Sequence, residues 1–154
     1  MESDIFFSNF QYIDPEIGEV QPNYSMGVSD GKVQEIGNRI EKPKGITEIN
    51  LNNAFITPGF INIHCHLTGS GRKVPQFFLK HDRLAQFFAN LFIVQKLLTK
   101  TMYKTAKDAL FHGITTVRTL GDISFDILEF RDKIRAGKLM GPRIFSAGKG
   151  ISAK

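Results

Sequence analysis

The spacing of apolar residues changes its period near residue 58, and this change divides the chain into two parts. Before it, short apolar stretches alternate with turn residues. Residues 24–28 lead into Asp30-Gly31, a strong hairpin pair, and residues 32–36 alternate apolar and polar side chains as a return strand. Several short strands separated by frequent turns predict an all-β segment over residues 4 to about 57, as a small sandwich or open barrel.

After Pro58-Gly59 the apolar residues follow longer patterns. Residues 60–67 are apolar enough to predict a strand buried on both faces, as in a parallel sheet. From about residue 82 to residue 111, apolar side chains recur at helical spacing, with a break expected near residues 99–101. Gly113 then follows as the expected helix-ending residue.

The same alternation of strand and helix continues toward Lys154. Residues 114–120 predict a second strand, and Ser124 is a candidate cap for the next helix. Residues 143–148 predict a third strand after Gly141-Pro142. The order is β-α-β-α-β, so the handedness of such crossovers predicts three neighbouring parallel strands and an α/β fold.

Candidate chemistry lies at the end of the first of these strands. His64 and His66 are two residues apart, so both point to one face of a strand while Cys65 points to the other. Two imidazoles side by side are a good start on a divalent metal site, although a catalytic zinc site usually takes three protein ligands or more. Cys65 then faces the helices, as a small core residue.

Composition excludes several other classes of protein. The chain has 154 residues, 42% hydrophobic content, one cysteine and a net charge of +5, which indicates an ordinary globular protein without a disulfide framework. No run is long enough to span a membrane and the acidic N-terminus lacks the features of a secretory signal, so we expect a cytoplasmic protein with no membrane partner. The basic residues are scattered and not interleaved with stacking aromatics, so we expect no nucleic-acid partner.

Four segments, in order, resemble a known family. Residues 58–67, with the sequence PGFINIHCHL, resemble the first-strand signature of the amidohydrolase superfamily. Residues 113–118 resemble its second strand and residues 141–148 its third, especially in the imidazolonepropionase-like and prolidase-like branch. Residues 30–37 resemble the N-terminal half of the small β-sandwich of such enzymes. Asn62 and Thr119 stand where many relatives have aspartate, which leaves the exact branch and the substrate open.

The resemblance implies a (β/α)8 TIM barrel with one or two divalent metals, zinc by expectation, at its C-terminal face. Residues 1–57 are then part of a β-sandwich domain, and residues 58–154 are an incomplete barrel with its first three strands. His64 and His66 match the first-strand metal ligands. The family's other ligands, on the fourth, fifth, sixth and eighth strands, have no counterpart in this sequence. A barrel takes roughly 250 residues, so the resemblance implies the N-terminal portion of a longer metal-dependent amidohydrolase.

Three further side chains have candidate roles. Arg72 lies in the loop after the first strand, where a guanidinium could bind a substrate carboxylate; the alternative is a solvated arginine. Arg118 lies between apolar neighbours, so we expect it to be buried and paired with an acid, with Asp122 as a candidate. His112 precedes Gly113 and is expected to interact with the helix C-terminus.

Three functions remain open. The first is hydrolysis of a C–N bond in a small amide, such as an acylated amino acid, a dipeptide or a cyclic amide, with the isolated 154-residue chain inactive. The second is a non-catalytic fragment that pairs with its missing C-terminal part or with itself, through an open sheet edge and an exposed helix face. The third is a basic binding module.

Overall fold

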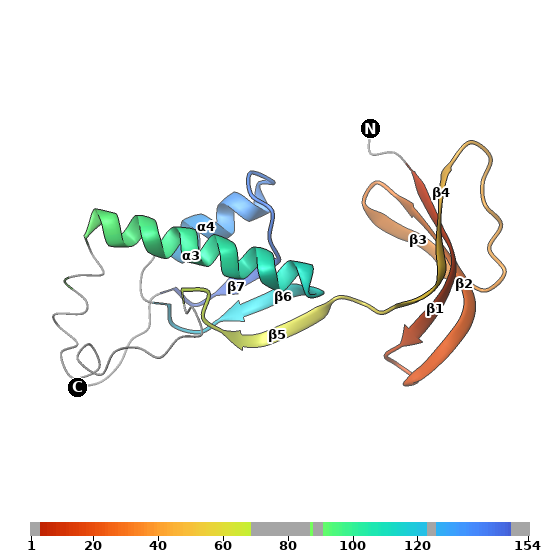
Figure 1. Cartoon of the computed structure of the whole chain (residues 1–154), viewed down its shortest axis with the longest axis horizontal. Coiled ribbons are helices and arrows are strands. Elements are labelled where there is room, and N and C mark those ends of the chain that lie inside the picture. The colour runs from red at the N-terminus through yellow and green to blue at the C-terminus, as the bar shows by residue number, and fades with distance from the viewer. Residues whose placement is uncertain (1–3, 69–86, 88–90, 123–125, 149–154) are drawn as a thin grey trace. The chain divides into compact units, whose positions relative to one another are not determined.

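A computed structural model describes residues 4–68, 87, 91–122 and 126–148 of the chain. Within it the chain forms two compact units, Met1–Pro58 and Gly59–Lys154. Together they give a mixed α/β fold (Figure 1).

The first unit is a four-stranded sheet with the strand order β3-β2-β1-β4. Its strands are β1 (Ile5–Asp14), β2 (Glu19–Ser29), β3 (Lys32–Gly37) and β4 (Thr47–Ile56). The β1-β2 and β2-β3 pairs are antiparallel, and β1 and β4 are parallel. The expected hairpin at Asp30-Gly31 is therefore confirmed, and both of its residues take positive φ angles, 51° and 68°.

The pairing of β1 with β4 contains an irregularity. Asn52 and Asn53 both adopt left-handed backbone, with φ of 49° and 64°, where the β1-β4 register shifts. Asparagine tolerates this conformation better than most residues. The strand continues across it, so β4 is a single element from Thr47 to Ile56.

Phe6 and Phe10 are the buried apolar residues of this unit, 4% and 0% exposed. The ring of Tyr24 lies 6.5 Å from that of Phe10 and stacks on Tyr12 at 5.7 Å. Residues 4–58 form a single sheet and show no second packed sheet, so the expected sandwich stays a prediction.

The second unit contains a parallel three-stranded sheet in the order β5-β6-β7. These strands are β5 (Phe60–Cys65), β6 (Ile114–Thr119) and β7 (Arg143–Ser146), with α3 (Phe92–Phe111) and α4 (Asp126–Arg135) between them in sequence. Figure 1 shows both helices on one face of the sheet. The predicted β-α-β-α-β order and the parallel strands are confirmed.

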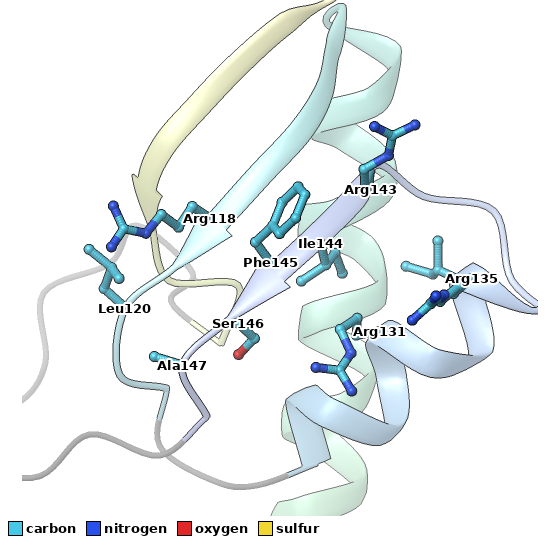
Figure 2. A pocket seen from close by; sticks show the side chains of 10 residues that line it. Arg118, Leu120, Arg131, Arg135, Arg143, Ile144, Phe145, Ser146 and Ala147 are labelled. Carbon is cyan, nitrogen blue, oxygen red and sulfur yellow. The ribbon is translucent and has the colours of Figure 1, made fainter.

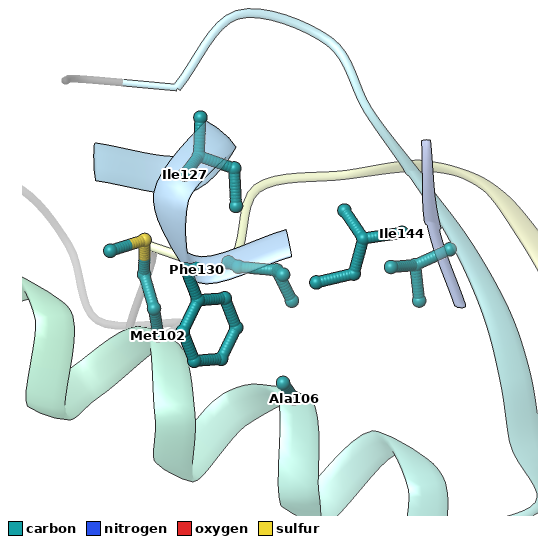
Figure 3. Close-up of a cluster of buried hydrophobic side chains, with 7 residues drawn as sticks. Met102, Ala106, Ile127, Phe130 and Ile144 are labelled. Atoms are coloured by element: carbon teal, nitrogen blue, oxygen red, sulfur yellow. The ribbon is translucent and has the colours of Figure 1, made fainter. Parts of the chain in front are cut away.

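The core of this unit lies between the two helices and the covered face of the sheet (Figure 3). Met102 and Ala106 of α3 meet Ile127 and Phe130 of α4, and all four are at most 2% exposed. The sheet contributes Val117 of β6 and Ile144 of β7, and the loop after β5 adds Leu67.

The structure corrects the expectation that β5 is buried on both faces. Phe60, Ile61 and Ile63 are 58%, 66% and 70% exposed. The helices that the structure describes pack against β6 and β7, so no described element covers these side chains.

The long helix also differs in detail from its prediction. It begins at Phe92, because Leu91 has the extended angles φ −68° and ψ 132°. The predicted residues before it lie mostly outside the described part of the chain, as does Ser124. No break occurs at residues 99–101, where the hydroxyls of Thr99 and Thr101 each donate to the carbonyl four residues earlier. These bonds let threonine sit within a continuous helix.

The end of α3 agrees with the sequence. His112 is the C-cap, and its Nδ1 lies 2.7 Å from the carbonyl oxygen of Asp108. Gly113 follows with φ of 81°, and its carbonyl accepts a hydrogen bond from the backbone of Phe60 at 2.8 Å. The end of the helix is thereby joined to the start of β5.

Candidate metal centre

The histidine pair lies at the C-terminal end of β5. His64 is within the strand and His66 directly follows its last residue, Cys65. Their imidazole ring centroids are 5.4 Å apart with an interplanar angle of 69°, and both residues are exposed. The backbone N–H of His64 donates to Oδ1 of Asn62 at 3.1 Å. The two rings therefore lie side by side, as strand alternation requires.

Two neighbouring imidazoles of this kind fit a divalent metal. Zinc bonds each histidine nitrogen at about 2.0–2.1 Å, so two donor nitrogens must come within about 4 Å of each other. Ring centroids 5.4 Å apart are compatible with that separation. Within residues 4–68, 87, 91–122 and 126–148, no group of three or more His, Cys, Asp or Glu residues could hold a metal. The described residues thus supply two candidate ligands, and metal binding stays a prediction.

Cys65 lies between the histidines in sequence but on the other side of the strand. It is partly buried and packs against the core of the second unit. Burial raises the pKa of its thiol, and the carboxylate of Asp122 raises it further. A thiol that resists ionisation is a poor nucleophile and a poor metal ligand, so Cys65 has the structural role expected from the sequence.

A group of polar side chains joins the C-terminal ends of the three parallel strands. The hydroxyl of Thr68, after β5, donates to Oδ1 of Asp122, after β6, at 3.3 Å. The backbone N–H of Asp122 donates to the carbonyl of Gly148, after β7, at 3.0 Å. Thr119 donates from its hydroxyl to that of Ser146 at 2.8 Å.

From the sequence, Asp122 was expected only as a partner for Arg118, and Thr68 had no expected role. The available signal was position, because both residues follow predicted parallel strands whose C-terminal ends meet at one edge. The hydroxyl of Ser146, at the end of β7, accepts hydrogen bonds from the hydroxyl of Thr119 and from the backbone N–H of Gly148.

The structure contradicts the expected burial of Arg118. Val117 and Thr119 occupy the buried side of β6, at 1% and 0% exposure, so the residue between them points to the opposite, exposed face. No ion pair or hydrogen bond between Arg118 and Asp122 occurs in the described part of the chain. The apolar sequence neighbours of Arg118 therefore belong to the other side of the strand.

Arg118 instead lines a hollow of about 880 Å³ beside β7 and α4 (Figure 2). Three more arginines line it, namely Arg131, Arg135 and Arg143. Arg131 is paired with the neighbouring Asp132 at 2.8 Å. Neither histidine lines this hollow, so it is separate from the candidate metal centre. Arg72, the candidate for substrate carboxylate binding, lies outside the described residues.

Comparison with known proteins links this arrangement to one enzyme family. Residues 55–153 match the sequence profile described as the amidohydrolase family. A dihydroorotase of Anaeromyxobacter sp. (strain K) is 33% identical over 73 residues, which are 47% of this chain and 17% of that protein. An imidazolonepropionase of Thermoplasma acidophilum is 29% identical over 62 residues, which are 40% of this chain and 15% of that protein.

Solved structures show the same fold. The crystal structure of a Xaa-Pro dipeptidase with bound methionine in the active site superposes with a TM-score of 0.75 at 24% identity, covering 97% of this chain and 34% of that one. The chain therefore spans about a third of the length of that structural relative. No helix among the described residues is long and apolar enough to cross a membrane.

Proposed function

Because the chain belongs to the amidohydrolase family, we propose that it is the N-terminal portion of a metal-dependent hydrolase of C–N bonds and supplies the metal ligands of the first barrel strand. The observation that carries this proposal is the pair of adjacent imidazole rings of His64 and His66 at the end of β5. The family match over residues 55–153 includes both histidines. The resemblance found in the sequence is thereby confirmed at the level of the family.

The proposed architecture extends the observed sheet. Strands β5, β6 and β7 are the first three strands of a (β/α)8 barrel, with α3 and α4 as its first two outer helices. Their parallel order and the placement of both helices on one face support this assignment. Residues 1–57 are the first part of a β-sandwich domain, and residues 58–154 begin the barrel.

Three residues of this chain have proposed roles at the metal centre. His64 and His66 hold a divalent ion, with zinc as the expected metal, and the side chain of Asn62 accepts the backbone N–H of His64. A divalent metal supplies Lewis-acid polarisation and lowers the pKa of water toward neutrality. The remaining ligands expected in the family have no counterpart in the 154-residue sequence, so the isolated chain is inactive as a hydrolase.

The proposed substrate is a small amide. Relatives named dihydroorotase, imidazolonepropionase and Xaa-Pro dipeptidase support this class. An acylated amino acid, a dipeptide or a cyclic amide fits it. Arg72 is the proposed contact for a substrate carboxylate, and the proposed location of the enzyme is the cytoplasm, without nucleic-acid or membrane partners.

A second function, self-association without catalysis, has its own supporting observation. Phe60, Ile61 and Ile63 are apolar side chains that are 58–70% exposed on β5, which is an edge strand of the sheet. Burial of these side chains against the C-terminal part of a longer chain or against a second copy would stabilise the second unit.

Calorimetric titration of the purified chain with Zn²⁺ tests the proposed function. We expect binding that is lost when His64 and His66 are both replaced by alanine. His112→Ala is the matched control, because His112 is an exposed histidine that caps α3. Binding that survives in the double variant, or disappears in the control, would contradict the assignment of the metal ligands.

A further inference from the structure

His66 is the less firmly held member of the histidine pair. It follows the last residue of β5, whereas His64 lies within the strand. The orientation of its ring therefore depends on how the next residues are anchored. Leu67 is 1% exposed in the core of the second unit, and Thr68 is 7% exposed. The chain after His66 is thus fixed by two buried side chains, one apolar and one polar.

Asp122 is the polar anchor of this turn. Its Oδ1 accepts from the hydroxyl of Thr68 at 3.3 Å, which joins positions 54 residues apart in sequence. Its backbone N–H donates to Gly148 at 3.0 Å. These bonds tie the turn after β5 to the ends of both neighbouring strands.

One carboxylate oxygen of Asp122, Oδ2, is a buried hydrogen-bond acceptor without a partner among the described residues. The residue is 3% exposed, yet Oδ2 has no hydrogen-bond partner among the residues that the structure describes. A buried polar atom without a partner is costly, and such atoms in folded proteins call for a functional explanation. A residue needed only for packing would avoid that cost with a smaller or apolar side chain.

We propose that Asp122 is a positioning residue for the histidine pair, acting through Thr68 on the turn that follows His66. The inference rests on the proposed function, since it concerns the same metal ligands. Residues that orient metal ligands from behind typically change metal affinity by 10–100-fold when replaced. Asp122 and Thr68 have this relation to His66, and neither touches the metal in the proposal.

Two substitutions separate positioning from general stability. Thr68→Val keeps the shape of the side chain and removes the donor, and Asp122→Ala removes the acceptor. The matched control is Thr119→Val, because Thr119 is 0% exposed and its hydroxyl makes a shorter bond, 2.8 Å, to Ser146 on the side of the sheet away from β5. The Zn²⁺ affinity of the whole chain and the absorption spectrum of bound Co²⁺ are measured for each variant.

We expect Thr68→Val and Asp122→Ala each to weaken Zn²⁺ binding about tenfold and to change the Co²⁺ spectrum, which reports ligand geometry. The double variant should bind no more weakly than the worse single variant, because both changes break one link. Thr119→Val should lower the melting temperature with its Zn²⁺ affinity within about twofold of the unmodified chain, since it lies outside that link.

Folded Thr68→Val protein that binds Zn²⁺ as the unmodified chain does would overturn the inference, even if Asp122→Ala does not fold. An equal loss of affinity in Thr119→Val would also overturn it, because the effect would then be general. If these variants bind normally while the His64 and His66 double variant does not bind, only this inference fails. If the double variant binds normally, the proposed function fails and this inference falls with it.

Discussion

Gly59 and Thr115 approach each other so closely that no larger residue fits at position 59. A Cβ on Gly59 would lie 2.2 Å from both Cγ2 and Oγ1 of Thr115 and 2.7 Å from its Cβ. Rotation of the threonine side chain cannot relieve the contact with its Cβ. Because Gly59 has no side chain, the start of β5 can lie close against β6. The backbone hydrogen bond from Phe60 to Gly113 lies next to this contact.

Gly59→Ala is expected to destabilise the second unit by about 1–3 kcal/mol, the usual cost of forcing extra atoms into a packed position. Thermal or urea unfolding measures the change. Gly27→Ala in β2 is the control, because a Cβ there meets nothing within 4 Å, and its effect should stay within about 0.5 kcal/mol. If the Gly59 variant is as stable as the unmodified chain, the start of β5 moves away from Thr115 of β6 without a cost in stability.

Met102 and Leu97 lie on the same helix but should differ strongly in their contribution to stability. Met102 is 0% exposed in the core, whereas Leu97 is 62% exposed. Met102→Ala is expected to cost about 2–5 kcal/mol, because it leaves a cavity between α3 and α4. Leu97→Ala should cost about 0.5 kcal/mol or less. Similar losses for both variants would mean that α3 packs through a different face.

Cys65 should react slowly with iodoacetamide in the folded chain. Burial, and then the charge of Asp122, raise the pKa of the thiol, so less thiolate is present at a given alkaline pH than in the unfolded chain. A pKa raised by folding contributes stability below the unfolded value and loses it as the pH rises through the folded value. The alkylation rate at several pH values, with and without urea, gives the pKa of the thiol in the folded and unfolded chain, and the stability change follows from the difference. Equal rates in the two states would contradict the burial of Cys65.

Self-association should depend on the exposed apolar side chains of β5. Replacing Ile61 and Ile63 with lysine is expected to shift the sedimentation coefficient toward the monomer, because these side chains are 66% and 70% exposed. Ile17→Lys is the control, since Ile17 is 58% exposed in a turn of the first unit. If the β5 variant associates as the unmodified chain does, another surface is responsible.

Much of the second unit could be predicted from local sequence. Gly113 ends a helix because its φ of 81° suits glycine, and the strand-helix order follows from apolar period and handedness. Exposure could not be predicted in the same way. Ile61 and Arg118 both lie in apolar stretches of sequence, yet both are exposed. Ile61 is exposed because the described helices pack against β6 and β7, and Arg118 is exposed because it points away from the buried side of β6.

The candidate site was predictable in part for the same reason. His64 and His66 were recognised because strand alternation is a local property. Thr68 and Asp122 were not joined, because a contact between residues 54 positions apart depends on how the strands align. Only the parallel register of β5 with β6 brings their ends together.

The most direct test of the metal centre is a zinc titration followed through the imidazole signals of the chain in two-dimensional NMR spectra. We predict that the ring signals of His64 and His66 shift together and saturate at one Zn²⁺ per chain, while those of His112 stay in place. His112 is the internal control, because its ring already contacts the carbonyl of Asp108. If only one ring of the pair shifts, or if all histidines shift in parallel without saturation, His64 and His66 do not form a metal site.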